Sequence, residues 1–232
     1  HLVELGGGNR RNDLVAGQED LVHSGAWVWK SQHDTDQGVP LVAEEAVVNI
    51  LSKLAKLEQR AYGIFTFGGT ATNMYGMKLG LKKANPRSGQ DGIDGKIKVF
   101  VTEDAHFSHA ASADWLGIGT KNVVTIKAKE DRTSDITDLE IQLRKAISSG
   151  FVLGTIIING GTTYDHAIDD IKEVIQLRNR LVKEFQLTYK PHVHVDAVIG
   201  WIWLFFQDYS WSSNPLELST EAIEHIKYQY DK

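Results

Sequence analysis

The sequence predicts an α/β protein in which a mostly parallel sheet carries helices on both faces. Short apolar or β-branched runs alternate with helical runs along most of the 232 residues, which is the pattern of βαβ units. Apolar and polar side chains alternate over residues 191–197 with the period of two that is typical of a strand. A polar helical run precedes this strand, and Asp196 lies at its end. Open α/β sheets bind ligands at the carboxyl ends of their strands, so Asp196 is expected at a ligand-binding edge.

The expected elements follow one another in a regular order. Residues 1–40 show little periodicity and are interpreted as an N-terminal arm, and residues 41–232 as a partial domain. Helical spacing predicts helices over 40–54, 71–84, 110–116, 168–185 and 219–232, with a further helix beginning near 135. Apolar and β-branched runs predict strands over 62–67, 97–102, 122–127, 151–159 and 191–197.

Composition narrows the classes of function. The formal net charge is -5 and there is no basic tract, so nothing favours a nucleic acid or an anionic membrane as a partner. No apolar run reaches the roughly 18 residues of a membrane span. The sequence has no cysteine, which excludes disulfides and thiolate chemistry and is compatible with a reducing cytosol. We therefore expect a cytoplasmic protein that binds neither nucleic acid nor membrane.

A glycine-rich turn follows the first predicted strand. Gly68-Gly69-Thr70 leads into a helix, whose first amides are free to bind an anion, and Thr70 adds a hydroxyl donor. The turn therefore indicates a phosphate site at Gly69 and Thr70. The alternative is a tight turn that needs glycine for its backbone angles. The stretch is neither a P-loop nor the Rossmann Gly-x-Gly-x-x-Gly motif.

Two further strands are followed by polar side chains. His106 comes a few residues after the strand over 97–102, and Gly161-Thr162-Thr163 follows the strand over 151–159. We expect both near the same edge as Asp196. His109 is expected on a solvated helix face, and Asp169 as a carboxylate at a helix start.

The strand over 191–197 also permits a metal site. His192, His194 and Asp196 alternate on one face and are the residue types that metal-dependent hydrolases use as ligands. His106, His109 and His166 could add ligands, so a metal-dependent hydrolase is an alternative function. The further His that usually follows the Asp in such enzymes is replaced by Ala197.

Five stretches of the sequence resemble one family. They are Gly63–Tyr75, Glu103–Ser108, Leu116–Val123, Gly161–Thr163 with Ile168-Asp169, and His194–Ala197. In this order they resemble motifs of the pyridoxal-phosphate-dependent group II amino-acid decarboxylases, a family that includes glutamate, cysteine-sulfinate, aromatic-amino-acid and diaminobutyrate decarboxylases. The resemblance covers about residues 40–205.

The resemblance implies an architecture, a cofactor and a role for each site residue. Residues 41–232 would be part of the large, cofactor-binding domain of the fold type I (aspartate-aminotransferase-like) enzymes. Gly69 and Thr70 would hold the phosphate of pyridoxal 5'-phosphate, His106 would stack on its ring and help position the substrate carboxylate, and Thr163 would line the surroundings of the ring. Asp196 would pair with the protonated ring nitrogen and keep the ring an electron sink.

The sequence departs from the family at several positions. The family usually carries Gly where His166 stands and a small residue where Val198 stands, and Trp201 and Trp203 replace a Gly-rich stretch. The family's Schiff-base lysine lies in a Ser/Thr/Asp-x-His-Lys motif downstream of the aspartate, and no His-Lys pair follows Asp196.

The expected function is decarboxylation of an L-amino acid with pyridoxal phosphate, by a homodimer. We expect the chain to be an incomplete portion that is inactive alone and lacks the C-terminal part and the small domain. A non-catalytic relative of the fold is the remaining alternative.

Overall fold

A computed structural model describes residues 38–57 and 62–230, which fall into two compact units, one ending at Phe67 and the other beginning at Gly68. The second unit contains the four-stranded parallel sheet, so the predicted α/β class is confirmed. The interpretation of residues 1–40 as an arm stays a prediction, because residues 1–37 lie outside the described part.

The first unit contributes one described helix, α1, over Gly38–Leu54. Residues 62–67 form no strand, and here the expectation was wrong. The amide of Phe65 donates to the side chain of Glu44 instead of to a neighbouring strand. Apolar composition alone does not make a strand, because a strand also needs a partner for its backbone groups.

The sheet has the strand order β2-β1-β3-β4, with every pair parallel. The strands are β1 (Ile97–Thr102), β2 (Val123–Ile126), β3 (Val152–Asn159) and β4 (His192–Asp196). The chain moves from β1 to β2 in one direction and then back across β1 to β3 and β4. The segments after β1 and after β3 therefore diverge, and such a switch point is where open α/β sheets bind ligands.

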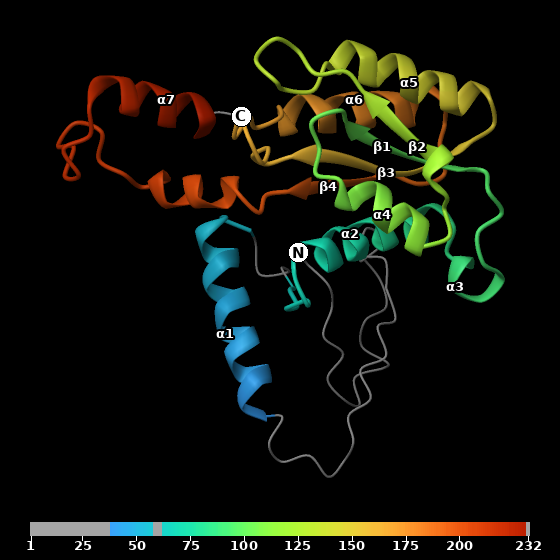
Figure 1. Cartoon of the computed structure of the whole chain (residues 1–232), viewed down its shortest axis with the longest axis horizontal. Coiled ribbons are helices and arrows are strands. Elements are labelled where there is room, and N and C mark those ends of the chain that lie inside the picture. The colour runs from blue at the N-terminus through green and yellow to red at the C-terminus, as the bar shows by residue number, and fades with distance from the viewer. Residues whose placement is uncertain (1–37, 58–61, 231–232) are drawn as a thin grey trace. The chain divides into compact units, whose positions relative to one another are not determined.

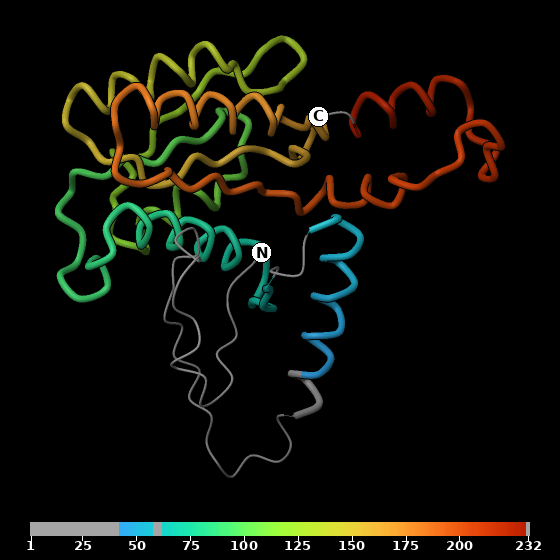
Figure 2. Tube along the Cα trace, turned by 180° about the vertical axis from the view of Figure 1, so that it is seen from behind, coloured from blue at the N-terminus to red at the C-terminus, as the bar shows by residue number. Residues whose placement is uncertain are grey.

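Helices cover both faces of the sheet, as predicted (Figures 1 and 2). Helices α2 (Gly69–Ala84) and α4 (Ser108–Trp115) lie on one face, and α5 (Ile136–Ser148) and α6 (Ile171–Glu184) on the other. Right-handed crossovers that run in opposite directions place their helices on opposite faces, which explains why α4 and the pair α5 and α6 are separated.

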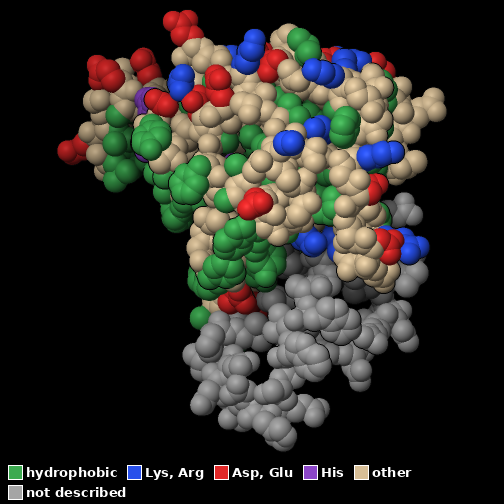
Figure 3. All heavy atoms as spheres, turned by 45° about the vertical axis from the view of Figure 1, so that its right-hand side comes forward, with side chains coloured by type: hydrophobic (Ala, Val, Ile, Leu, Met, Phe, Trp, Pro, Cys, Tyr) green, Lys and Arg blue, Asp and Glu red, His purple; other side chains and the backbone are tan. Residues whose placement is uncertain are grey.

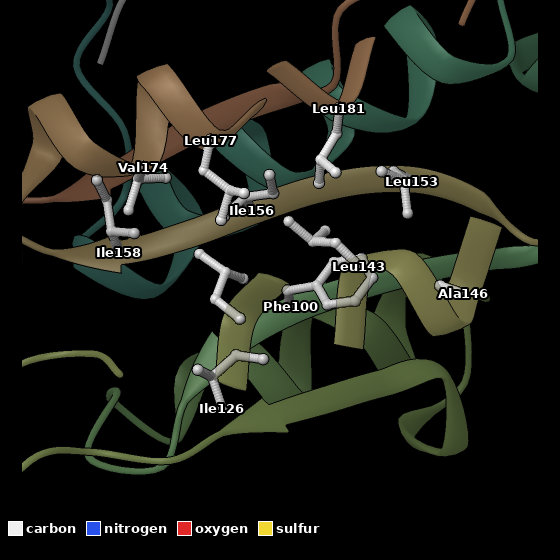
Figure 4. Packing of buried hydrophobic residues seen from close by; sticks show 11 residues of the cluster. Phe100, Ile126, Leu143, Ala146, Leu153, Ile156, Ile158, Val174, Leu177 and Leu181 are labelled. Atoms are coloured by element: carbon white, nitrogen blue, oxygen red, sulfur yellow. The ribbon is translucent and has the colours of Figure 1, made fainter. Parts of the chain in front are cut away.

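Alternation along the strands gives each face its own core. Phe100 of β1 packs toward α5 and α6, whereas its neighbours Val99 and Val101 pack toward α2 and α4. Figure 4 shows the first of these cores, in which Leu143 of α5 and Leu177 of α6 meet strand residues. Both faces are buried, so the sequence of the strands is nearly continuous in apolar residues.

The chain beyond β4 forms the 3-10 helix η3 (Gly200–Phe206) and helix α7 (Thr220–Tyr230), and short elements α3 (Ser88–Asp91) and η2 (Thr120–Asn122) complete the order. Trp203 and Phe206 of η3 lie beside further rings of this segment, Tyr209, Trp211 and His225. Among the described residues, no helix combines the length and the apolar character that crossing a membrane requires.

Candidate functional site

Asp196 is the last residue of β4 and lies at the carboxyl edge of the sheet. It pairs in register with Asn159 of β3, and its carbonyl accepts a hydrogen bond from the Gly160 amide at 2.8 Å. Its side chain is buried, with 8% of the residue exposed. The Oδ2 atom accepts from Asn73 Nδ2 at 2.8 Å and lies 3.3 Å from His109 Nε2.

These contacts set the charge of the carboxylate. Burial alone would raise the pKa of Asp196, but the contacts with His109 and Asn73 outweigh burial and lower the pKa to about 2. Asp196 is therefore ionised at neutral pH in a site that is largely removed from water. A buried anion of this kind is suited to pair with a cationic group of a ligand.

Asn73 of α2 connects three polar side chains. Its Nδ2 donates to Asp196 and also to Ser108 Oγ at 3.0 Å, and its Oδ1 lies 2.9 Å from His194 Nε2. An ionised carboxylate can only accept, so the amide nitrogen must face Asp196 and the amide oxygen must face His194. His194 Nε2 therefore carries a hydrogen and donates it to Asn73.

His194 is buried and neutral. Burial, followed by the nearby charges of His109 and His192, lowers the pKa of His194 to about 3. Its ring lies directly against Gly76 of α2, where a Cβ would come within 2.2 Å of His194 Nδ1. Glycine at position 76 lets the helix approach β4 closely enough for Asn73 to reach both His194 and Asp196.

His106 follows β1 and is half-buried. Its Nδ1 lies 2.8 Å from Ser108 Oγ, and the Ser108 amide donates to the same nitrogen at 3.3 Å. Ser108 in turn accepts from Asn73. A chain of hydrogen bonds thus links His106 to Asp196 through Ser108 and Asn73, which places both predicted residues at one edge of the sheet.

Gly69 and Thr70 are the first residues of α2 and are exposed. The preceding Gly68 has a φ of 116°, in the region that favours glycine, and its carbonyl accepts from the Thr72 amide at 3.2 Å. The first amides of a helix have no acceptor within it, and Gly68 offers no side-chain cap, so these amides are available to a ligand. Val198, two residues after Asp196, would be 3.6 Å from a Cβ on Gly69, so the start of α2 lies beside the residues that follow Asp196.

The structure places Thr163 in the turn that follows β3, where it is exposed. Its neighbour Thr162 is buried, and Thr162 Oγ1 accepts from the Ala167 amide at 3.0 Å. Thr162 therefore holds the turn, and Thr163 is the threonine that a ligand can reach.

Two expectations from sequence were wrong. His109 does not lie on a solvated helix face: it is 1% exposed, because α4 packs against α2 and the inner side of α4 carries His109 together with Ser112 and Ala113. Asp169 does not cap a helix either. It is fully buried and accepts from the amides of Asn159 and Ser134, both at 2.6 Å.

The residue that caps α6 is Asp170, which accepts from the Glu173 amide at 2.8 Å. Asp169 instead joins the end of β3 to the segment that precedes α5. Burial raises the pKa of Asp169, and the two backbone hydrogen bonds act against this rise.

The metal-hydrolase alternative is not supported. His192 and Asp196 are four residues apart on an extended strand, so their Cα atoms are about 13 Å apart, which one metal ion cannot bridge. The imidazole of His194 is hydrogen-bonded to Asn73. Within residues 38–57 and 62–230, no group of three or more His, Cys, Asp or Glu side chains is arranged to hold a metal.

Sequence reasoning missed Asn73 and His109 as site residues. A signal for Asn73 exists, because it shares one side of α2 with Gly76 and Gly80, and two small residues at this spacing indicate a close approach to another element. For His109 no local signal exists, since its burial depends on how α4 packs.

Comparisons with known proteins identify the family of the chain. A family model, the pyridoxal-dependent decarboxylase conserved domain, matches residues 39–208. L-2,4-diaminobutyrate decarboxylase of Acinetobacter baumannii is 29% identical over 172 residues, which are 68% of this chain and 32% of that protein. An acidic amino acid decarboxylase of Xenopus tropicalis is 29% identical over 171 residues, 73% of this chain and 32% of that protein.

Solved structures give the same result. A crystal structure of mouse CSAD matches 71% of this chain and 33% of its own chain, with a TM-score of 0.62 and 29% identity. The glutamate decarboxylase domain of a Vibrio parahaemolyticus protein matches 72% of this chain and 36% of its own, with a TM-score of 0.59 and 30% identity. The chain spans about a third of the length of these relatives. The chain belongs to the pyridoxal-dependent decarboxylase family.

Proposed function

We propose that this protein binds pyridoxal 5'-phosphate at the carboxyl edge of its sheet and decarboxylates an L-amino acid. The observation that carries the proposal is the buried, ionised Asp196 beside the exposed start of α2. One ligand with a cationic ring at one end and a phosphate at the other would satisfy both features. The names of the relatives, which are amino-acid decarboxylases, support the same reading.

The residues of this edge fit the cofactor. The amides of Gly69 and Thr70, at the positive end of the α2 dipole, and the Thr70 hydroxyl would hold the phosphate. Asp196 would accept from the protonated ring nitrogen. His106, half-buried after β1, would lie against the ring and meet the substrate carboxylate. Thr163, exposed after β3, would line the surroundings of the ring.

The cofactor, when bound, supplies an electron sink for the electron pair that remains when carbon dioxide leaves the substrate. The work of the chain is to keep that sink effective. Asp196, ionised and partly shielded from water, holds a proton on the ring nitrogen, and Asn73 keeps Asp196 in place. The link from His106 through Ser108 to Asn73 fixes the orientation of the imidazole relative to Asp196.

The substrate class and the assembly are also part of this proposal. The substrate is an L-amino acid, and the protein is a cytoplasmic homodimer. Exposed apolar side chains on η3 support a protein interface, since apolar surface marks such sites. The exposed side chains of η3 are Trp201, Ile202 and Phe205. In Figure 3, hydrophobic side chains reach the surface in several places. Sedimentation equilibrium tests the dimer.

The function is tested by cofactor binding and by turnover. We expect pyridoxal phosphate to bind with 1:1 stoichiometry, and Thr70→Ala and Asp196→Ala each to weaken it. Release of labelled carbon dioxide from a panel of L-amino acids then tests activity. Binding without turnover is the result expected of this chain alone, because no His-Lys pair follows Asp196. Turnover by it would contradict the expectation that it is inactive alone, and no binding to the folded protein would refute the proposal.

A further inference from the structure

His109 is a buried imidazole with a single close polar contact among the described residues. It lies on α4 with 1% exposure, and neither ring nitrogen has a regular hydrogen-bond partner within the described residues. Its one close polar contact there is the approach of Nε2 to Asp196 Oδ2 at 3.3 Å. Burying a polar ring without partners is unfavourable, so the contact with the carboxylate is what can offset that cost.

We propose that His109 is a positioning residue that donates from Nε2 to Asp196 Oδ2 and thereby keeps the carboxylate ionised and oriented for a cationic ligand group. The pairing rests on the geometry of this chain, and its use toward the cofactor ring rests on the proposed function. His109 does not touch the cofactor in this proposal and acts through Asp196.

The two oxygens of Asp196 have different environments. Oδ2 is approached by both Asn73 and His109, whereas Oδ1 receives the Val198 amide at 3.5 Å, a weak contact. Two donors on one oxygen restrict rotation of the carboxylate. Oδ1 is then the oxygen with capacity left for a ligand, and His109 contributes to selecting it.

Of the groups that face Asp196, His109 is the imidazole that can stabilise the negative charge of the carboxylate. From α2 comes the neutral Asn73, and from β4 comes His194. The pKa of His194 is lowered to about 3, and its Nε2 hydrogen is donated to Asn73. The imidazole that contacts Asp196 directly is therefore that of His109.

The first test needs no substitution in His109. Long-range proton–nitrogen NMR of the cofactor-free protein reports whether Nε2 of His109 carries a hydrogen. We expect a protonated Nε2 whose resonance shifts when Asp196 is replaced by Asn. An unprotonated Nε2, or a resonance that Asp196→Asn leaves unchanged, overturns the proposal whatever the protein binds.

The second test separates a positioning role from a packing role. His109→Leu removes the donor, and His109→Gln supplies an amide donor. We expect His109→Leu to raise the dissociation constant of pyridoxal phosphate about tenfold and His109→Gln to restore it to within about threefold. In an Asp196→Ala background the Leu substitution has little further effect, because both carboxylate oxygens are gone.

The outcomes distinguish this inference from the proposed function. If the protein binds the cofactor but His109→Leu binds it equally well, the positioning role is wrong and the proposed function stands. If the folded protein does not bind the cofactor, the proposed function and the cofactor role of His109 both fail, and the NMR result alone decides the pairing with Asp196. If His109→Leu does not fold, the decision falls to the NMR test and to His109→Gln, for which a loss as large as tenfold would contradict the proposal.

Discussion

Asn73 donates from Nδ2 to Asp196 Oδ2 over 2.8 Å, and this bond joins helix α2 to the end of strand β4. The same amide group accepts from His194 and donates to Ser108, so one side chain of α2 satisfies three partners on two other elements, β4 and α4. Buried networks of this kind rigidify a site when every member is satisfied and are costly when one member is removed.

Replacing Asn73 by Leu should therefore destabilise the fold. The substitution leaves Asp196 and His194 without their partner, and we expect the free energy of unfolding to fall by about 3 kcal/mol. Urea denaturation followed by circular dichroism measures this change. The matched control is Asn179→Leu on the exposed side of α6, which should change stability by less than about 0.5 kcal/mol. Equal effects of the two variants would contradict the network.

Gly76→Ala should also destabilise, although Ala normally stabilises a helix interior relative to Gly by about 0.5–1 kcal/mol. The new Cβ would lie 2.2 Å from His194 Nδ1, so the ring would have to move away from Asn73. Thermal melting measures the effect. Gly89→Ala is the control, because its Cβ meets the flexible end of Lys82. A Gly76→Ala protein that melts at or above the wild-type temperature would show that the close approach is not needed.

Stability should decline in mild acid because of two histidines. The pKa of His194 is lowered to about 3 by burial, then by neighbouring charges, and that of His192 to about 4 by the same causes. Both bind protons more readily in the unfolded chain. Their contribution is complete above the unfolded pKa of about 6.5 and is lost as the pH falls toward 4 and 3, by up to about 1.4 kcal/mol per pH unit for each.

The pKa of Asp196, lowered to about 2, adds a loss of the same sign between about pH 4 and pH 2, and the raised pKa of Asp169 acts in the opposite sense. Unfolding free energies from urea titrations at pH 7.5, 6.5 and 5.5 test this dependence. His194→Gln should flatten the curve between pH 6.5 and 5.5. A stability that is constant over this range in the unmodified protein would show that these histidines are not buried in neutral form.

The strands are predictable from sequence because burial selects local patterns of apolar residues. The β-branched run of β3 and the alternation of apolar and polar residues in β4 are such patterns, and the structure has strands there. Residues 62–67 have a similar composition but form no strand, since pairing depends on a partner that composition does not reveal. Strand order is not local either. The alternation of strand and helix runs predicted the α/β class, and the motif resemblance implied the fold type I architecture.

The candidate site, like the sheet, was predictable from the sequence only in part. The position of Asp196 was predictable because a residue at the end of a parallel strand lies at the carboxyl edge of the sheet. The turn at Gly69 was inferred from a strand over 62–67 that the structure does not have, and what remains of that inference is the pair of glycines at the start of helix α2. Asn73 and His109 were missed because their role depends on the distance between α2, α4 and β4. His109 has the sequence context of a surface helix, and tertiary packing buries it. The catalytic role of His106 and the binding roles of Gly69, Thr70, Thr163 and Asp196 stay predictions.

Val198 should limit how well the cofactor fits. Its amide contacts Asp196 Oδ1 and its Cγ2 lies beside Gly69, so its methyl groups occupy the space next to both the predicted ring and phosphate sites. The family usually has a small residue at this position. Val198→Ala should therefore lower the dissociation constant of pyridoxal phosphate by about threefold to tenfold, on the scale of one or two methyl groups. Its effect on stability should be small, because the side chain is 55% exposed.

Fluorescence titration with the cofactor measures the affinity of Val198→Ala. The matched control is Val42→Ala, which changes an exposed valine on α1. Weaker binding in Val198→Ala than in the unmodified protein would mean that the methyl groups of Val198 contact the ring favourably instead of obstructing it.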